Sequence, residues 1–298
     1  MNALSPYARH AFVGTSTNNS WSNMLSFIPD GSRVLDVGCS TGKFGEALTL
    51  HKNCTSIGVD LNAADIAEAV TRLDAAYVFD ITQPNAQEIL GTFDVVVFGD
   101  VVEHLPDPRA VLAAVHLLLK PEGFIVYSIP NMGHLSVRLD ALEGRFAYTE
   151  IGLLDKTHLH FYDRPEVQSV FEDSGFLLTD ELPTIVGYPD KWVAQRLDAL
   201  GLAASSPFFS MLRGTDADVF QFVGVAIPTS SKGNHRRDPA SFVMPQDEML
   251  QKSNELIVEN ERLEGQLRML HEKINRIRNR PFAAVMRELR RRIGRVRA

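Results

Sequence analysis

The chain has 298 residues, a net charge of -7, 45% hydrophobic and 22% charged residues, which is the composition of a globular protein with one large or two small domains. No stretch contains the roughly 18 consecutive apolar residues that cross a bilayer, and two cysteines indicate free thiols in a reducing compartment. These features exclude a membrane-spanning or disulfide-stapled protein and favour a cytoplasmic one, and the acidic net charge argues against broad nucleic-acid binding.

Strands and helices are predicted to alternate from residue 33 to residue 130, after a short helical cover over residues 1–30. Apolar runs bounded by turn residues alternate with helical patterns such as 108–119. Nearly continuous apolar strands separated by helices are typical of a doubly wound, mostly parallel sheet in an α/β protein. The predicted strands are 33–38, 56–61, 77–81, 93–100 and 124–130.

The pattern changes after residue 130. Residues 131–162 are irregular and rich in His, Arg and aromatic residues, and a helix is predicted over 164–175, where a glycine closes it. Strands predicted at 176–181 and 219–228 enclose a small helical insertion. We therefore expect one α/β domain over residues 1–228.

A glycine turn follows the first predicted strand. The segment 36–42 reads DVGCSTG and opens a helix, where glycines permit close approach of a ligand and the helix start offers N–H groups. Counted from Gly38, the dinucleotide fingerprint would need glycines where Ser40 and Lys43 stand, so it is absent. Asp36, two residues before the turn glycine, suits a cationic ligand, and S-adenosylmethionine carries an amino group and a sulfonium.

Two more acidic residues stand at the ends of the next two predicted strands. Asp60 is placed to accept both hydroxyls of a ribose, and Asp80 is placed to meet an adenine amino group. One Asp in such a position is more often a helix cap. Three of them on successive strands predict S-adenosylmethionine as the cofactor.

Residues 33–130 resemble the class I S-adenosylmethionine-dependent methyltransferases, in particular the ubiquinone-biosynthesis O-methyltransferase type. LDVGCSTG, GVDL and FDI are similar to its first three motifs, and FDVVVFGDVVEHLPDP resembles its (D/E)xxEHxxDP segment. The likeness continues to Gly175. It implies a seven-stranded sheet with an antiparallel final hairpin. The cofactor contacts that the motifs and the resemblance together predict are Asp36, Gly38, Cys39, Ser40, Gly42, Asp60, Leu61, Asp80, Ile81, Gly99, Asp100 and Val101.

Three residues are candidates for catalysis. Because the sulfonium is already activated, transfer requires mainly that the acceptor be positioned and lose a proton. Glu103 and His104 follow the fourth predicted strand, beside the expected methyl position, and His158 lies in the segment expected to close over the acceptor. The alternative is that each of the three only orients a loop.

The same region offers a set of ligands for a divalent cation. Asp100, Glu103, His104 and His158 supply mixed oxygen and nitrogen donors. Their spacing resembles the ExxEH and distant His of RNA 3′-terminal 2′-O-methyltransferases, with Asp100 in place of the first Glu. We expect a metal-free site and keep the cation as the alternative.

Cationic and aromatic residues are frequent in the region expected to face the methyl acceptor. They suit a polar or anionic acceptor, and residues 136–163 resemble bacterial methyltransferases of surface-polysaccharide assembly. The main hypothesis is therefore O-methylation of a sugar or glycan hydroxyl. The alternatives are a phenolic or quinone acceptor, an RNA end, and a non-catalytic scaffold with a vestigial methyltransferase domain. The acceptor-side residues are Arg138, Arg145, Tyr148, Lys156, Tyr162 and Lys191.

The sequence predicts a separate C-terminal region, which follows a polar linker over 229–246. Apolar residues at heptad spacing predict a coiled coil over 247–280, and Asn260 among leucines favours a parallel homodimer. The alternative is an amphipathic helix packed on its own domain. Residues 281–298 predict a basic amphipathic helix that binds an anionic membrane surface or a protein partner, at the inner face of the membrane. The alternative is a solvated tail.

Overall fold

The computed structural model describes residues 18–230 of the chain. The predicted coiled coil over 247–280, the predicted tail helix over 281–298 and nearly all of the predicted linker lie outside the described residues, and they stay predictions. Within the described range, no helix combines the length and the apolar character that crossing a membrane requires.

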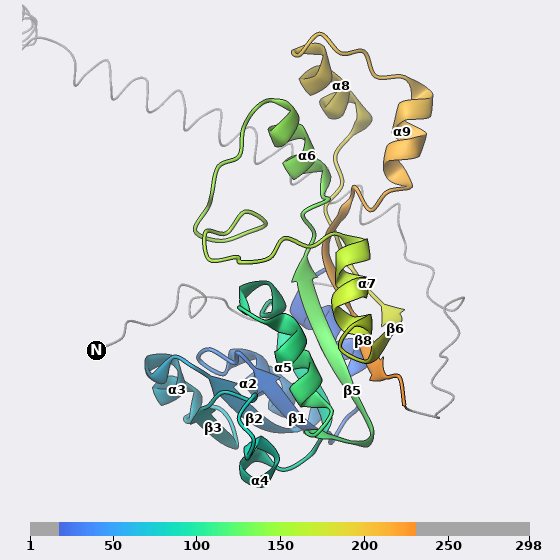
Figure 1. Cartoon of the computed structure of the whole chain (residues 1–298). Coiled ribbons are helices and arrows are strands. Elements are labelled where there is room, and N and C mark those ends of the chain that lie inside the picture. Colours follow the sequence, from blue (N-terminus) through green and yellow to red (C-terminus); the bar gives the residue numbers. More distant parts are fainter. Residues whose placement is uncertain (1–17, 231–298) are drawn as a thin grey trace, which may run out of the picture. The chain divides into compact units, whose positions relative to one another are not determined.

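A mixed β-sheet forms the centre of the described residues (Figure 1). Strands β1 to β5 run parallel, and β8 lies antiparallel between β5 and β6, in the order β3-β2-β1-β4-β5-β8-β6. The short β7 pairs with β8 past the end of β6 and so continues the same edge. The strands are β1 (Arg33–Val37), β2 (Thr55–Asp60), β3 (Ala75–Val78), β4 (Phe93–Gly99), β5 (Leu119–Pro130), β6 (Phe176–Glu181), β7 (Thr184–Ile185) and β8 (Val219–Pro228).

The strand order has a switch point between β1 and β4. Strands β2 and β3 extend the sheet on one side of β1, and β4 and β5 extend it on the other. In such sheets, ligands bind outside the carboxyl ends of the strands at the switch point. The predicted doubly wound, mostly parallel sheet with an antiparallel final pair is confirmed, and it directs attention to this one edge.

Helices cover both faces of the sheet. In β4, Val95 and Val97 pack with α1 and α2 on one face, while Val96 and Phe98 pack with α4, α5 and α7 on the other. A strand that is buried on both faces must be apolar throughout, which explains the uninterrupted run in this segment. The helices are α1 (Ser20–Phe27), α2 (Lys43–Lys52), α3 (Ala63–Ala69), α4 (Ala86–Leu90), α5 (Pro108–Val115), α6 (Leu135–Leu142), α7 (Arg164–Glu172), α8 (Asp190–Asp198) and α9 (Ser206–Arg213), with a 3₁₀ turn at Val102–His104.

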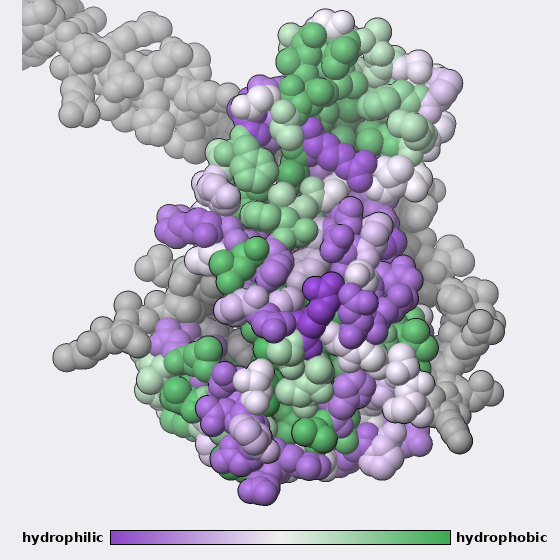
Figure 2. Space-filling model, in the orientation of Figure 1, coloured by the Kyte–Doolittle hydropathy of each residue, from purple (hydrophilic) through white to green (hydrophobic). Residues whose placement is uncertain are grey.

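Helices α6, α8 and α9 pack together beyond the carboxyl end of β5 (Figure 1). The predicted helical insertion between β6 and β8 is confirmed by α8 and α9, whereas α6 falls in a segment that was expected to be irregular. Figure 2 shows hydrophobic side chains gathered on the surface over these helices. Their shared buried cluster comprises Leu135, Leu139, Val193, Leu197, Leu212 and Ala217.

The third strand ends three residues earlier than the sequence predicts, at Val78 in place of Ile81. This strand is at the edge of the sheet, and Tyr77 and Val78 are exposed, so an apolar run does not mark its bounds. Asp80 consequently lies in a turn, where its carboxylate accepts the N–H and the O–H of Thr82 at 2.9 and 2.7 Å.

Replacing Phe171 by Ala tests the packing of the sheet against α7. The ring of Phe171 is fully buried and its centroid lies 4.7 Å from that of Tyr127. We expect the free energy of unfolding, measured by denaturant titration, to fall by about 3–5 kcal/mol. Phe146→Ala, at a 52% exposed ring, is the matched control and should cost much less. Equal losses in the two variants would contradict this account of the core.

Candidate functional site

A cavity of about 540 Å³ opens at the switch point, where β1, β2 and β4 end. Asp36, Asp60 and Gly99 line it from these three strands. Its volume lies in the range that holds a small organic ligand. The cavity also reaches α1, the segment 151–158 and β8.

The turn after β1 is tight enough to require glycine. Gly38 has φ +70°, and a Cβ there would lie 2.6 Å from Cγ2 of Val101. The N–H groups of Gly38 and Cys39 both donate to the carbonyl of Val59, at 2.8 and 3.1 Å. The turn is therefore fixed to β2, and its backbone forms part of the cavity wall.

Asp60 joins two turns through its carboxylate. Oδ2 accepts the N–H of Ser40 at 2.9 Å, and Oδ1 accepts the N–H of Asn62 at 2.8 Å. The hydroxyl of Ser40 donates to the carboxylate of Asp65 at 3.1 Å. A carboxylate held by backbone amides has a fixed orientation and keeps lone pairs for a ligand.

Asp36 is a buried acidic residue of the site. It is 4% exposed, and its Oδ2 has no hydrogen-bond partner among the described residues. Burial, helped by the negative charge of Asp60, raises the pKa of Asp36 to about 7. A buried carboxyl with an unmatched oxygen is costly by itself, so it fits a ligand that brings a cation or a donor.

Asp100 follows β4 in the left-handed region, with φ +55°. Its N–H donates to the carbonyl of Ser128, and its Oδ1 accepts the hydroxyl of Ser128 at 2.8 Å and the amide of Gln221 at 2.9 Å. β5 and β8 thus hold the residue in a conformation that non-glycine residues rarely adopt. Strain of this kind is concentrated at functional sites.

Glu103, His104 and His158 come together beside this turn. One possible ligand atom from each lies within 4.8 Å of the others. Glu103 is 1% exposed, both of its carboxylate oxygens lack a partner among the described residues, and burial followed by the charge of Asp100 raises its pKa well above the usual value. Burial, and then His104, lowers the pKa of His158.

Most of the cofactor residues expected from the sequence line this cavity. Gly42, Leu61, Asp80 and Ile81 do not. Leu61 is 71% exposed and Ile81 is packed in the core, while Gly42 caps α2 with φ +79°. The predicted residues that line it are Asp36, Gly38, Cys39, Ser40, Asp60, Gly99, Asp100, Val101, Glu103, His104 and His158.

The sequence did not indicate several residues of the wall. Asn19, Trp21 and Met24 line the cavity from α1, and Phe220 and Gln221 line it from β8. These segments are far from the glycine turn in the chain, and no motif marks them. Only the expected helical cover over residues 1–30 pointed to α1.

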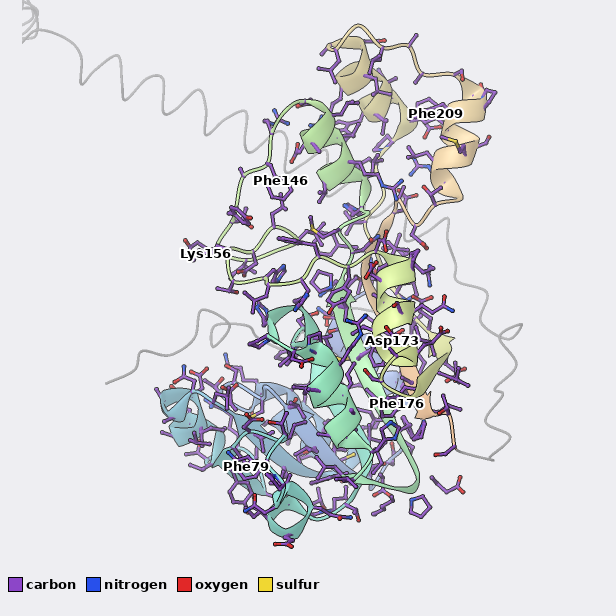
Figure 3. The ribbon with its side chains drawn as sticks, viewed as in Figure 1. Phe79, Phe146, Lys156, Asp173, Phe176 and Phe209 are labelled. Carbon is purple, nitrogen blue, oxygen red and sulfur yellow. The ribbon has the colours of Figure 1, made fainter. Side chains whose placement is uncertain are left out.

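The acceptor-side residues named from the sequence do not line the cavity. Arg145 forms an ion pair with Asp140, and Lys156 forms one with Glu150 at 2.6 Å. Tyr162 is buried in the core. Figure 3 shows Lys156 and Phe146 on the segment that joins α6 to α7. The cationic lining that the sequence suggested is therefore not formed. Arg145 and Lys156 pair with acidic residues nearby in the chain, and Arg138 donates to Thr215.

Comparison with known proteins identifies a family and finds relatives that are similar to part of the chain. A family model described as a methyltransferase domain matches residues 15–181. The ubiquinone biosynthesis O-methyltransferases of Pseudomonas aeruginosa and Azotobacter vinelandii are 36% and 37% identical to the chain over 106 residues, which is 34% of this chain. The match spans 45% of the length of those relatives. A solved S-adenosylmethionine-dependent methyltransferase from Archaeoglobus fulgidus is 20% identical, covering 69% of this chain and 91% of its own, with a TM-score of 0.47.

Replacing Asp60 by Asn tests the carboxylate between the two turns. The Asn side chain has one oxygen where Asp has two, so it cannot accept at both positions. We therefore expect the affinity for S-adenosylmethionine, measured by calorimetry, to fall roughly tenfold to a hundredfold. Asp30→Asn, at a side chain that is 73% exposed, is the matched control and should bind as the native chain does. Unchanged binding by Asp60→Asn would refute this role.

Replacing Asp36 by Asn tests the cause of its raised pKa. The folded protein holds this proton more tightly than the unfolded chain, so the stabilisation from Asp36 is present below pH 4 and is lost as pH rises to about 7. We expect Asp36→Asn to be more stable than the native chain at pH 8, by on the order of 3 kcal/mol, and similar at pH 4. Denaturant titrations of the ligand-free protein at both pH values measure this, and a constant difference between them would contradict it.

Proposed function

The chain belongs to the methyltransferase-domain family, and from that premise we propose that it methylates a hydroxyl oxygen of a sugar or glycan. It is an S-adenosylmethionine-dependent methyltransferase, and the strand order is that of the class I fold. The observation that carries the proposal is the cavity at the switch point, where a glycine turn and several carboxylates lie beside two imidazoles.

The residues present fit the cofactor. S-adenosylmethionine, when bound, supplies a methyl group activated by a sulfonium. We assign Asp60 to the ribose hydroxyls, since its two oxygens are already oriented by backbone amides. We assign Asp36 to the cationic part of the cofactor, because its buried carboxyl lacks a partner for Oδ2 among the described residues.

His158 is the proposed base that removes the proton of the acceptor. Its Nδ1 lies 3.2 Å from the carbonyl of Leu153, so Nδ1 carries the hydrogen and Nε2 has a free lone pair. The lowered pKa keeps the ring neutral near pH 7, which a base requires. Glu103 is less suited to this role, because burial raises the pKa of its carboxyl and favours the protonated form.

The charges around the cavity favour a neutral acceptor over an anionic one. Asp100 and Asp155 line the side near His104, and Lys43 is the one Lys or Arg among the described lining residues. An anionic acceptor would be repelled in this setting. Trp21 and Gln221 offer an aromatic face and an amide, which suit a sugar hydroxyl.

Exposed apolar residues next to the cavity support a lipid-linked acceptor. The ring of Phe161 lies 6.3 Å from that of His158 and 6.4 Å from that of Phe146, and Tyr148 follows at 5.7 Å from Phe146. These three rings are 38–60% exposed, and Ile151, 47% exposed, also lines the cavity. An apolar chain attached to the sugar would have a surface to bind on.

A phenolic or quinone acceptor is the second candidate. The observation in its favour is the identity of 36% with proteins named ubiquinone biosynthesis O-methyltransferases. The non-catalytic scaffold has no such support, since Asp36, Asp60 and the glycine turn at Gly38 line the cavity. A divalent cation on Glu103, His104 and His158 is the alternative to a metal-free base.

The choice between acceptors is tested with methyl-labelled S-adenosylmethionine. We expect label to enter neutral saccharides or neutral glycolipids, seen as a gain of about 14 Da per methyl group by mass spectrometry. Asp60→Asn protein, assayed at a limiting concentration of S-adenosylmethionine, serves as the control in which labelling should be reduced. Transfer to catechols and hydroquinones alone would overturn the glycan proposal and favour the second candidate.

His158→Gln tests the base. We expect kcat to fall roughly 10²- to 10⁴-fold while the affinity for S-adenosylmethionine is unchanged. His160→Gln is the matched control, two residues away on a side chain that does not line the cavity. Exhaustive chelation should leave the native rate unchanged. If chelation abolishes activity and Mn²⁺ or Mg²⁺ restores it, a bound divalent cation would be favoured over His158 acting as a metal-free base.

A further inference from the structure

We propose that Asp155 is a positioning residue that acts through Thr157 to fix the orientation and tautomer of the His104 imidazole. The proposal rests on the function proposed above and adds to it a residue that holds the catalytic groups in place. Asp155 is 1% exposed, and it lines the cavity from the segment between α6 and α7.

The first step is the contact of Asp155 with Thr157. Oδ1 of Asp155 accepts the hydroxyl of Thr157 at 2.7 Å and its N–H at 2.8 Å. A hydroxyl has one hydrogen, and the hydroxyl of Thr157 donates it to the carboxylate of Asp155. Toward any other neighbour, the oxygen of Thr157 can only accept.

The second step is the contact of Thr157 with His104. Nδ1 of His104 lies 3.2 Å from the hydroxyl oxygen of Thr157 and 3.2 Å from its carbonyl oxygen. Both oxygens are acceptors, so Nδ1 must carry the hydrogen and Nε2 keeps its lone pair. An Asp bonded directly to a His fixes the tautomer in the same way in serine hydrolases, and here a hydroxyl stands between the two.

Asp155 also bonds to the backbone of the residue that carries the second imidazole. Its carbonyl accepts the backbone N–H of His158 at 3.2 Å. The next two N–H groups, of Leu159 and His160, donate to the carbonyl of Glu103 at 2.9 and 3.1 Å. Two distant segments are joined in this way, and the rings of His104 and His158 are held with their centroids 4.8 Å apart. Asp155 is thus bonded within the segment that carries His158, and it reaches His104 through Thr157.

Asp155→Ala in the full chain tests the proposal, with Asp163→Ala as the matched control. Asp163 lies on the same segment and caps α7 by accepting the N–H of Glu166, without a contact to either ring. Two-bond ¹H–¹⁵N spectra of the ring nitrogens report the tautomer. We expect His104 to change from the Nδ1–H form to a mixture in Asp155→Ala only, with kcat lowered roughly tenfold or more and the affinity for S-adenosylmethionine unchanged.

Thr157→Val and Thr157→Ser separate positioning from folding. Val has the shape of Thr but no hydroxyl, so it should lower kcat, whereas Ser should restore it. An unchanged His104 tautomer in Asp155→Ala, or equal losses of kcat in Asp155→Ala and Asp163→Ala, would overturn the inference. The spectra and the calorimetry need no acceptor, so the inference remains testable if the glycan proposal fails.

Discussion

The carboxylate of Asp60 connects the parts of the cofactor side. It accepts one backbone N–H from the turn after β1 and one from the turn after β2. Because these turns start α2 and α3, the same two hydrogen bonds set where both helices begin relative to the sheet. Two turns of the cavity wall are therefore held in place by one side chain. The glycine turn alone would not determine this shape.

The core strands and the surrounding helices follow directly from the sequence. β1, β4 and β8 lie where their apolar runs predict, since a strand packed on both faces carries a nearly continuous apolar run. β3 departs from its prediction because it is an edge strand with exposed Tyr77 and Val78. α6 was not predicted, because only one side of this short helix is buried, in a small cluster with α8 and α9.

The site could be predicted only where the chemistry is local in sequence. Asp36, Gly38 and Asp60 belong to short segments that a motif describes, and they line the cavity. The partners of Asp100 could not be found in this way, because Ser128 and Gln221 are on strands 28 and 121 positions away. Sequence spacing indicates which residues share an element, and it does not reveal which side chains meet across the sheet. The roles of these residues in binding and catalysis stay proposals.

The carboxylates that line the cavity would affect the binding of both the methyl donor and the methyl acceptor. Asp36 and Asp60 repel each other, which contributes to the raised pKa of Asp36 in the ligand-free protein. A cationic donor relieves this repulsion on binding, and the donor loses its sulfonium charge when the methyl group leaves. Under the proposed function, the acidic cavity would hold the charged donor more strongly than the uncharged thioether that remains. The same field would disfavour an anionic acceptor, so one arrangement of charge would serve the retention of the donor, the release of the by-product and the proposed choice of a neutral hydroxyl.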